Sequence, residues 1–397
     1  MALLMNGKKL NELADINPNN DCKIKDIFEY LDLESVEIGR VIKYQIINKK
    51  KAPSRAQRIV KKEDILYQLV RPYQRNNFIE FRDQETMVVA STGFAVVRAK
   101  EKNYPLFLYY LINTNLFTKK VLQRCTGTSY PAINSQDLSN ILEYVSIDFD
   151  EQSKIADLLS AVDDLIAQQT DKIQAYERLK KFLLQKLFAN GEQQQPSLRF
   201  NGFTDAWQEK KLGELFKISD ETNLDNGLSF SKQDILSVSD KFGIINQIKL
   251  QGRSFAGNSI SKYKVVRDNQ IVYTKSPLKD KPYGIIKIAS NVEGIVSPLY
   301  VVNDVLDNSA WFMYYYFDLN SRTNNYLKPL VRLGAKHTMN ITNEEWLSGK
   351  VFISEAIQEQ SKIADLLSTV DDLIELNRKK LTAYQNMKQY FLQNMFC

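Results

Sequence analysis

The sequence predicts an α+β fold in which two mixed α/β domains are separated by two long helices that pair as an antiparallel coiled coil, with a pseudo-two-fold internal repeat. Two observations predict this fold. The decapeptide EQSKIADLLS occurs at residues 151–160 and again at 359–368. The segments before the two copies share a frame of short motifs but differ in most side chains. A repeat of about half the chain indicates one duplicated two-part unit rather than a solenoid.

The two mixed domains are expected at residues 1–150 and 210–354, and each follows the same frame. KKLNELADI near the start of the first domain corresponds to KKLGELFKI in the second, ILY corresponds to IVY, and STGFAVV corresponds to SPLYVVN. Runs such as MVVASTGFAVV and GIVSPLYVV are typical of strands in a mixed sheet. YPLFLYYLINTNLF and SAWFMYYYFDLNS indicate buried helices.

The repeated segments predict long helices at residues 151–189 and 355–397, with a linker at 190–209. Without a gap, residues 151–188 align with 359–396, and 22 of the 38 pairs are identical. Counting in sevens from Ile155 gives a heptad seam with a polar centre at Gln169 and Asn377, which would fix the register of an antiparallel pair. The predicted seam residues are Ile155, Leu158, Val162, Leu165, Gln169, Tyr176, Ile363, Leu366, Val370, Leu373, Asn377 and Tyr384.

Further apolar residues, among them Leu159 and Ile166, widen the stripe beyond a two-stranded seam. They predict a second surface for a partner protein. The alternative is that they belong to an ordinary core or dimer seam, which is the commoner role of amphipathic helices.

Composition and charge bound the class of protein. The chain has 397 residues, of which 44% are hydrophobic, so it can bury at least two cores. No segment has the ~18 apolar residues that a membrane span needs, and the first residues lack the pattern of a signal peptide. The three cysteines form no pairing pattern, which favours a cytoplasmic protein. A net charge of +6 gives mild support for a polyanionic partner.

Motifs for catalysis are missing from the sequence. His337 is the one histidine, which excludes metal sites built on several histidines. There is no G-x-x-x-x-G-K-[ST] for nucleotide phosphates and no G-x-G-x-x-G after a strand for a dinucleotide or similar cofactor. No Asn-Pro-Pro-aromatic or Asp-Pro-Pro-aromatic tetrapeptide occurs. We therefore expect no catalytic residues, no cofactor and no metal.

Basic residues interleaved with aromatic and amide side chains occur in loops of both domains. Lysine and arginine neutralise phosphates, and arginine, asparagine, glutamine, serine and threonine read base edges. Any single one could be a solvated surface charge, but basic loops recur at equivalent places of the frame. The candidates for DNA binding are Lys49, Lys50, Lys51, Arg55, Arg58, Arg71, Tyr73, Arg75, Arg124, Thr128, Ser129, Tyr130, Arg253, Lys275, Ser276, Lys279, Lys281, Tyr283, Arg332, Lys336 and His337.

The paired EQSKIADLLS helices and the joint PSLRFNGFTDAWQEKKLGEL at residues 196–215 resemble the specificity subunit of type I restriction-modification enzymes. The resemblance covers residues 8–396. It implies that each mixed domain is a target recognition domain for one half of a bipartite double-stranded DNA sequence, and that the helices form a spacer. It also implies that two modification subunits dock beside the helices to methylate adenine, and that restriction subunits join for cleavage.

Two other classes remain open at this point. A coiled-coil scaffold without DNA binding accounts for the helices but not for two divergent domains on one frame. A self-sufficient DNA methyltransferase or nuclease is disfavoured by the missing cofactor and catalytic motifs.

Overall fold

The structure is a computed structural model. It describes residues 5–19, 22–37, 39–83, 85–146, 148–189, 194–225, 227, 229–257, 259–333 and 339–396. The chain forms two compact units, and each of the two long helices contributes residues to both units. Unit 1 comprises Met1–Asp171 and Lys379–Cys397, and unit 2 comprises Lys172–Arg378. Each unit therefore holds one mixed α/β domain and a part of each long helix. Together with the two long helices, this composition confirms the predicted α+β fold class.

The domain of unit 1 is built on two four-stranded sheets. One has the order β2-β11-β8-β9 and the other β6-β3-β10-β7. A separate pair, β1 (Met5–Lys9) with β12 (Leu142–Ser146), is antiparallel. The sheet strands are β2 (Ala14–Ile16), β3 (Ile27–Leu31), β6 (Gln45–Asn48), β7 (Ala56–Val60), β8 (Ile65–Gln68), β9 (Phe78–Ile79), β10 (Val88–Ser91) and β11 (Phe94–Ala99), and a short pair is formed by β4 (Val36–Glu37) and β5 (Arg40–Val41).

Strand β8 lies between two hydrophobic cores. Ile65 and Tyr67 pack into one core with helices α2 (Pro105–Ile112) and α3 (Asn115–Leu122), whereas Leu66 packs into another with strand β10. Alternate residues of a strand point to opposite faces, so an unbroken apolar run suits a strand that is covered on both sides. The helices of this domain are α1 (Leu10–Leu13), α2 (Pro105–Ile112), α3 (Asn115–Leu122) and α4 (Ser135–Ser139), with 3-10 turns η1 (Lys49–Lys51) and η2 (Pro72–Gln74).

Unit 2 repeats the first sheet and changes the second. The order β14-β21-β18-β19 matches β2-β11-β8-β9, but the remaining strands form separate two-stranded pairs. The strands are β13 (Gln208–Lys211), β14 (Phe216–Ile218), β15 (Leu236–Ser239), β16 (Gly243–Asn246), β17 (Lys264–Val266), β18 (Ile271–Tyr273), β19 (Ile286–Ile288), β20 (Gly294–Val296), β21 (Val301–Val305), β22 (Arg332–Leu333), β23 (Met339–Asn340) and β24 (Lys350–Ile353). The helices are α6 (Leu212–Leu215), α7 (Gln247–Gln251), α8 (Ala310–Phe317), α9 (Asn320–Leu327) and α10 (Asn343–Ser348), with the 3-10 turn η3 (Lys232–Asp234).

The long helices are α5 (Phe149–Lys186) and α11 (Ile357–Asn394), each of 38 residues. Within unit 2 they run antiparallel, because Glu177 pairs with Arg378 and the later residue Lys180 pairs with the earlier residue Asp371.

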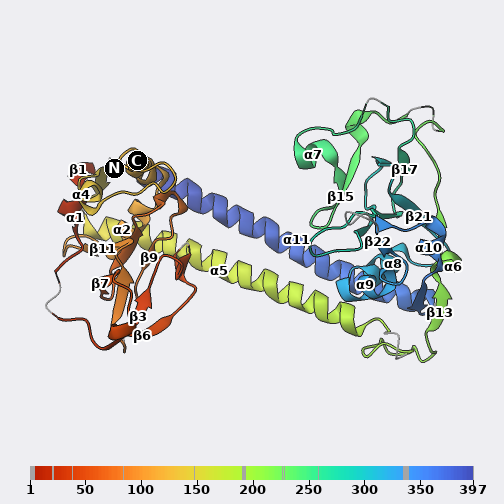
Figure 1. The fold of residues 1–397 in the computed structure, drawn as a ribbon, viewed down its shortest axis with the longest axis horizontal. Helices are drawn as coiled ribbons and strands as arrows, with labels where there is room; N and C mark the ends of the chain where they lie inside the picture. The colour runs from red at the N-terminus through yellow and green to blue at the C-terminus, as the bar shows by residue number, and fades with distance from the viewer. Residues whose placement is uncertain are drawn as a thin grey trace. The chain divides into compact units, whose positions relative to one another are not determined.

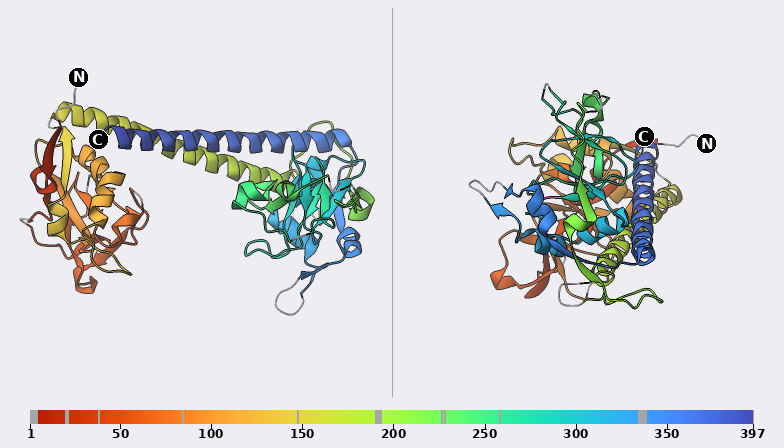
Figure 2. Two further views of the ribbon diagram at one scale, coloured as in Figure 1. Left: turned by 90° about the horizontal axis from the view of Figure 1, so that it is seen from above. Right: turned by 90° about the vertical axis from the view of Figure 1, so that its right-hand side faces the viewer.

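Within unit 1, Figures 1 and 2 show β1 and the last turns of α11 at one end of the domain and strands β3 and β6 at the other. Among the described residues, each helix is too short or too polar to cross a membrane.

A repeated glutamine ties the start of each long helix to its domain. The side-chain oxygen of Gln152 accepts a hydrogen bond of 2.8 Å from the backbone N–H of Tyr104, which caps α2. The side-chain oxygen of Gln360 accepts one of 2.9 Å from the backbone N–H of Ser309, which caps α8. Both glutamines are buried, so the shared EQS segment serves the same contact in both units.

Two of the predicted seam residues are exposed, and both lie on α5. Leu158 and Leu165 are 40% and 39% exposed, whereas Leu159 is 0% exposed. Either residue of the apolar pair Leu158–Leu159 could be the buried one. Leu159 is buried because α5 also covers its own domain, where Ala156 and Leu159 lie in the core of unit 1. The other predicted seam residues are buried or half-buried: Ile155, Val162, Gln169, Tyr176, Ile363, Leu366, Val370, Leu373, Asn377 and Tyr384.

Candidate nucleic-acid interface

In unit 1, three segments that carry predicted DNA-binding residues meet at the turn between β10 and β11. The backbone N–H of Thr92 donates to the carbonyl of Arg55 at 2.8 Å, and that of Leu69 donates to the carbonyl of Gly93 at 2.9 Å. The N–H of Ile133 in turn donates to the carbonyl of Leu69 at 3.0 Å. These bonds bring residues 54–56, 69–71 and 131–133 to one end of the domain.

Arg71 is the most constrained candidate at this place. It holds a left-handed backbone with φ 54°, and its N–H donates to the carbonyl of Pro131 at 2.7 Å. Its guanidinium carbon lies 4.2 Å from the ring centroid of Tyr130, and its buried Nε has no hydrogen-bond partner within the described part of the chain. Left-handed conformations of non-glycine residues cost energy and are often found at functional sites. Exposed Tyr73 follows in the same loop.

Two other candidates in unit 1 are engaged within the fold. Arg75, also left-handed with φ 54°, donates to the side chain of Asn115 at 2.7 Å and to the carbonyl of Asn113 at 3.3 Å. The ammonium of Lys49 donates to the carbonyl of Ile24 at 3.1 Å. These contacts give Arg75 the role of fixing the loop that carries Arg71.

The remaining candidates of unit 1 are mostly exposed. Half-buried Arg58 lies on β7, and its Nε also lacks a hydrogen-bond partner among the residues described. Lys50, Lys51, Arg55, Arg124, Thr128 and Ser129 are exposed.

Unit 2 places Lys275 where unit 1 has the loop of Arg71, directly after the corresponding strand β18. Lys275 also has a left-handed backbone, with φ 52°, and its ammonium donates to the side chain of Asn343 at 3.0 Å. Asn343 is the first residue of α10, so the loop after β18 contacts the start of a short helix, whereas Arg71 contacts Tyr130 and Pro131, which precede the short helix α4. Burial lowers the pKa of Lys275, and the positive charge of Lys264 acts in the same direction.

Several candidates of unit 2 are paired with carboxylates. The ammonium of Lys281 lies 2.7 Å from a carboxylate oxygen of Asp240, and the guanidinium of Arg332 lies 2.5 Å from one of Glu345. Arg332 has a side chain that is 82% exposed, so its ion pair is weak in water and a phosphate can replace the carboxylate.

The other candidates of unit 2 differ in their surroundings. The hydroxyl of Ser276 donates to the carbonyl of Thr274, and the carbonyl of Tyr283 accepts a hydrogen bond from Tyr273. Exposed Arg253 stacks on Phe255 at 4.7 Å. Lys279 is exposed, and Lys336 and His337 lie outside the described residues.

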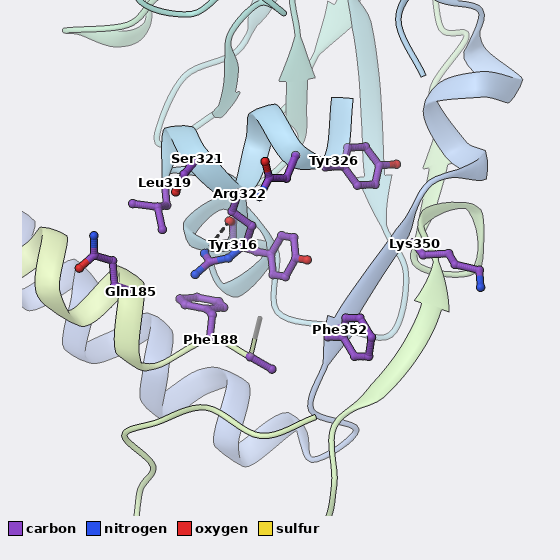
Figure 3. A pocket seen from close by; sticks show the side chains of 11 residues that line it. Gln185, Phe188, Tyr316, Leu319, Ser321, Arg322, Tyr326, Lys350 and Phe352 are labelled. Carbon is purple, nitrogen blue, oxygen red and sulfur yellow. Dashed lines mark hydrogen bonds between the residues drawn. The ribbon is translucent and has the colours of Figure 1, made fainter. Parts of the chain in front are cut away.

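Arg322 lines a cavity of about 330 Å³ in unit 2 and was not predicted as a site residue (Figure 3). Its guanidinium donates to the carbonyl of Leu184 at 2.6 Å and to that of Tyr316 at 2.9 Å, and it lies 4.6 Å from the ring centroid of Phe188. Burial lowers the pKa of Arg322 to about 10. A cation at the last turn of α5 stabilises the helix end, so this pocket belongs to the fold. The polar segment NSRTNNYL around Arg322 gives no signal for it.

Among the residues that the structure describes, no group of histidine, cysteine, aspartate or glutamate side chains is placed to hold a metal ion. The arrangement offers instead cationic, aromatic and amide groups on loops, which suit phosphates and bases.

Comparison with known proteins points to one family. Residues 5–177 match the type I restriction modification DNA specificity domain. The putative type I restriction enzyme MjaX specificity subunit of Methanocaldococcus jannaschii is 26% identical over 319 residues, which cover 73% of this chain and 67% of that protein. The type I restriction enzyme HindI specificity subunit of Haemophilus influenzae is 27% identical over 194 residues, which cover 47% of this chain and 42% of that protein.

Solved structures share the fold over the whole chain. The type I restriction-modification S subunit from M. genitalium has a TM-score of 0.62 at 14% identity and covers 100% of this chain and 96% of its own. A chain from a study of complex assembly and conformational transition of the type I R-M system has a TM-score of 0.58 at 19% identity and covers 100% and 99%.

Proposed function

We propose that this chain belongs to the family of type I restriction-modification specificity subunits and is the sequence-specific DNA-recognition subunit of such a complex; the match of residues 5–177 to the specificity domain supports this. Residues 1–150 and 210–354 are target recognition domains 1 and 2, and each reads one half of a bipartite target in double-stranded DNA. Residues 151–189 and 355–397 are the spacer helices, and 190–209 is the linker.

One observation carries the proposal: equivalent loops of a duplicated fold present different side chains. Unit 1 offers Arg71 stacked on Tyr130, and unit 2 offers Lys275 beside Asn343. Arginine stacked on an aromatic ring keeps its donors available for base edges, whereas lysine acts as a point charge. Different groups in the corresponding loops of one frame are what reading two different half-sites requires.

The partners follow from the family and from the helices. Two modification subunits dock beside α5 and α11 and methylate adenine, and restriction subunits join for cleavage, while this chain supplies recognition and no catalysis. We place the complex in the cytoplasm. Apolar side chains that remain exposed beyond the first residue of each long helix are the docking candidates: Leu158, Leu165, Leu179, Phe182, Leu376 and Tyr390.

Co-expression with a modification subunit, followed by mapping of N6-methyladenine, tests the proposal. The expected result is methylation at one bipartite sequence that is absent without this chain. Methylation that is independent of this chain would contradict the proposal.

The alternatives make different predictions in simpler assays. A scaffold without DNA binding shows no salt-dependent affinity for duplex DNA, whereas cationic loops on phosphates give an affinity that falls as salt rises. A self-sufficient methyltransferase transfers methyl groups as the purified chain alone, and a self-sufficient nuclease cleaves DNA alone.

A further inference from the structure

The same three side chains meet in both units at the contact between a domain and the two long helices. In unit 1, the hydroxyl of Tyr110 donates to Asp163 at 2.8 Å, and the ammonium of Lys388 lies 2.6 Å from the same carboxylate. The ammonium also lies 5.6 Å from the ring centroid of Tyr110. Burial raises the pKa of Tyr110, as does the charge of Asp163, so the phenol stays protonated and acts as a donor.

Unit 2 repeats this cluster with closely similar distances. Tyr315 donates to Asp371 at 3.0 Å, and Lys180 lies 2.8 Å from Asp371 and 5.4 Å from the ring centroid of Tyr315. The aspartates are related by the helix repeat (371 − 163 = 208), and so are the lysines (388 − 180 = 208).

The helices exchange roles between the two clusters. In unit 1 the aspartate comes from α5 and the lysine from α11, and in unit 2 the aspartate comes from α11 and the lysine from α5. The tyrosine comes from the domain, in α2 or α8. Each cluster therefore joins one domain to both helices at a single carboxylate.

The cluster is the second of two fixed points between a domain and its long helix. Gln152 holds the N-cap of α2, and Asp163 holds Tyr110 near the end of α2. Eleven residues separate the two points on α5, which is roughly 16 Å along a helix. One fixed point leaves α2 able to pivot, whereas two fixed points at this distance set its direction.

The residue that ends the domain helix extends the joint towards the loops. Asn113 ends α2, and it accepts hydrogen bonds from Asn77 at 2.9 Å and from Arg75 through its carbonyl. Its counterpart Asp318 ends α8 and lies 2.7 Å from Lys180. In unit 1 the Tyr–Asp–Lys cluster thus lies near Asn113, which is bonded to Arg75 in the loop that carries Arg71.

We propose that the Tyr–Asp–Lys cluster is a positioning joint that sets the direction of each recognition domain on the helix pair, and thereby the selectivity for the length of the unread spacer between half-sites. Lys388 and Lys180 are positioning residues, because they act through the aspartate and the tyrosine rather than on DNA. The spacer part of this inference rests on the proposed function.

The test uses the full chain, co-expressed with a modification subunit, and a library of target sites whose spacers differ by single base pairs. Lys388→Met removes the charge from the joint of unit 1, and Lys388→Arg keeps it. Lys380→Met is the matched control, because Lys380 is an exposed lysine of the same helix. Methylation at each spacer length and the melting temperature are measured for every variant.

Lys388→Met is expected to keep both half-site sequences and to lower the preference for the native spacer over spacers one base pair longer or shorter by about threefold or more, the size of a typical coupling between contacting residues. Lys388→Arg and Lys380→Met are expected to keep the wild-type preference. The charge-exchanged double variant, Asp163→Lys with Lys388→Asp, is expected to regain part of it.

An unchanged spacer preference in Lys388→Met would overturn the joint, even if the melting temperature falls, because the cluster would then only stabilise the fold. Should Lys388→Met fail to fold, Tyr110→Phe gives the same readout, since it removes the phenol hydroxyl alone. Wild-type protein that leaves every bipartite site unmethylated would instead contradict the proposed function, and the joint's role in spacing with it.

Discussion

Arg71 is the residue whose surroundings best fit direct reading of DNA. Its backbone is left-handed, its guanidinium stacks on exposed Tyr130, and its Nε has no protein partner among the described residues. We expect Arg71→Ala to weaken binding of the first half-site by about 1–3 kcal/mol if the arginine makes a bidentate base contact. Affinity measured at fixed salt on duplexes with one half-site altered checks this.

The matched control for that prediction is Arg40→Ala. Arg40 is an exposed arginine of β5 and is not among the DNA-binding candidates. If Arg71→Ala weakens binding of the second half-site instead, or leaves the affinity for the first half-site unchanged, Arg71 does not contact the bases of the first half-site.

Asp318 and Lys180 predict how the stability of unit 2 depends on pH. Burial alone would raise the pKa of Asp318, but Lys180 and Lys287 lower it below 3.8. Burial alone would lower the pKa of Lys180, but Asp318 and Asp371 raise it above 10.5. The contribution of the pair is therefore complete between these two values, is lost as pH falls through the lowered pKa of Asp318, and is lost as pH rises through the raised pKa of Lys180.

Comparing wild-type protein with Asp318→Asn by thermal melting across this range checks the sign. The difference in melting temperature should be constant near neutral pH and should shrink below pH 3.8. A difference that grows on acidification would contradict the assigned ion pair.

Residue types and their order in the chain could be predicted from the sequence, but their partners could not. Arg71 and Tyr130 were both candidates, yet their stacking depends on the backbone hydrogen bond from Arg71 to Pro131, which joins segments far apart in the sequence. Arg75 lies in the same basic loop as Arg71 and looked equally suited to DNA binding, but its guanidinium is hydrogen-bonded to Asn115 within the domain. The equivalence of Lys180 and Lys388 could have been predicted from the sequence, because the 208-residue offset of the helix repeat aligns the two lysines.

In the long helices, sequence periodicity predicts the helix but not which of two adjacent apolar residues is buried. Counting in sevens predicted a heptad seam on both helices, with Leu158 in the seam and the adjacent Leu159 on a second surface. A two-helix pattern has one buried face, whereas α5 packs against α11 and against its own domain. The fully buried residue is Leu159, and Leu158 is 40% exposed.

This correction reverses the expectation for docking and gives a matched pair of variants. Leu159→Glu should destabilise the chain by several kcal/mol, because an unpaired charge enters the core. Leu158→Glu should leave the melting temperature nearly unchanged and weaken co-purification of the modification subunit. Equal effects of the two variants on stability would contradict the assigned faces, and undisturbed docking in Leu158→Glu would remove this face as the docking surface.

At the scale of the molecule, we propose that the length of the two long helices sets the length of the unread spacer in the target. One heptad inserted into both helices near Gln169 and Asn377 keeps the seam in phase and lengthens each helix by about 10 Å. At about 10 base pairs for each 34 Å turn, this corresponds to about three more unread base pairs. Both half-site sequences should stay the same, because no reading loop has changed. An active complex that keeps the original spacer would contradict this role of the helices.

The most direct test of the central claim is a genome-wide map of N6-methyladenine in a host that lacks its own adenine methylation and expresses this chain with a modification subunit. The expected map shows one bipartite motif, with two specified half-sites at a fixed distance. Arg71→Ala is expected to relax only one of the two halves. A map without a motif, or an undivided motif that Arg71→Ala leaves intact, would contradict the claim that each domain reads its own half of the target.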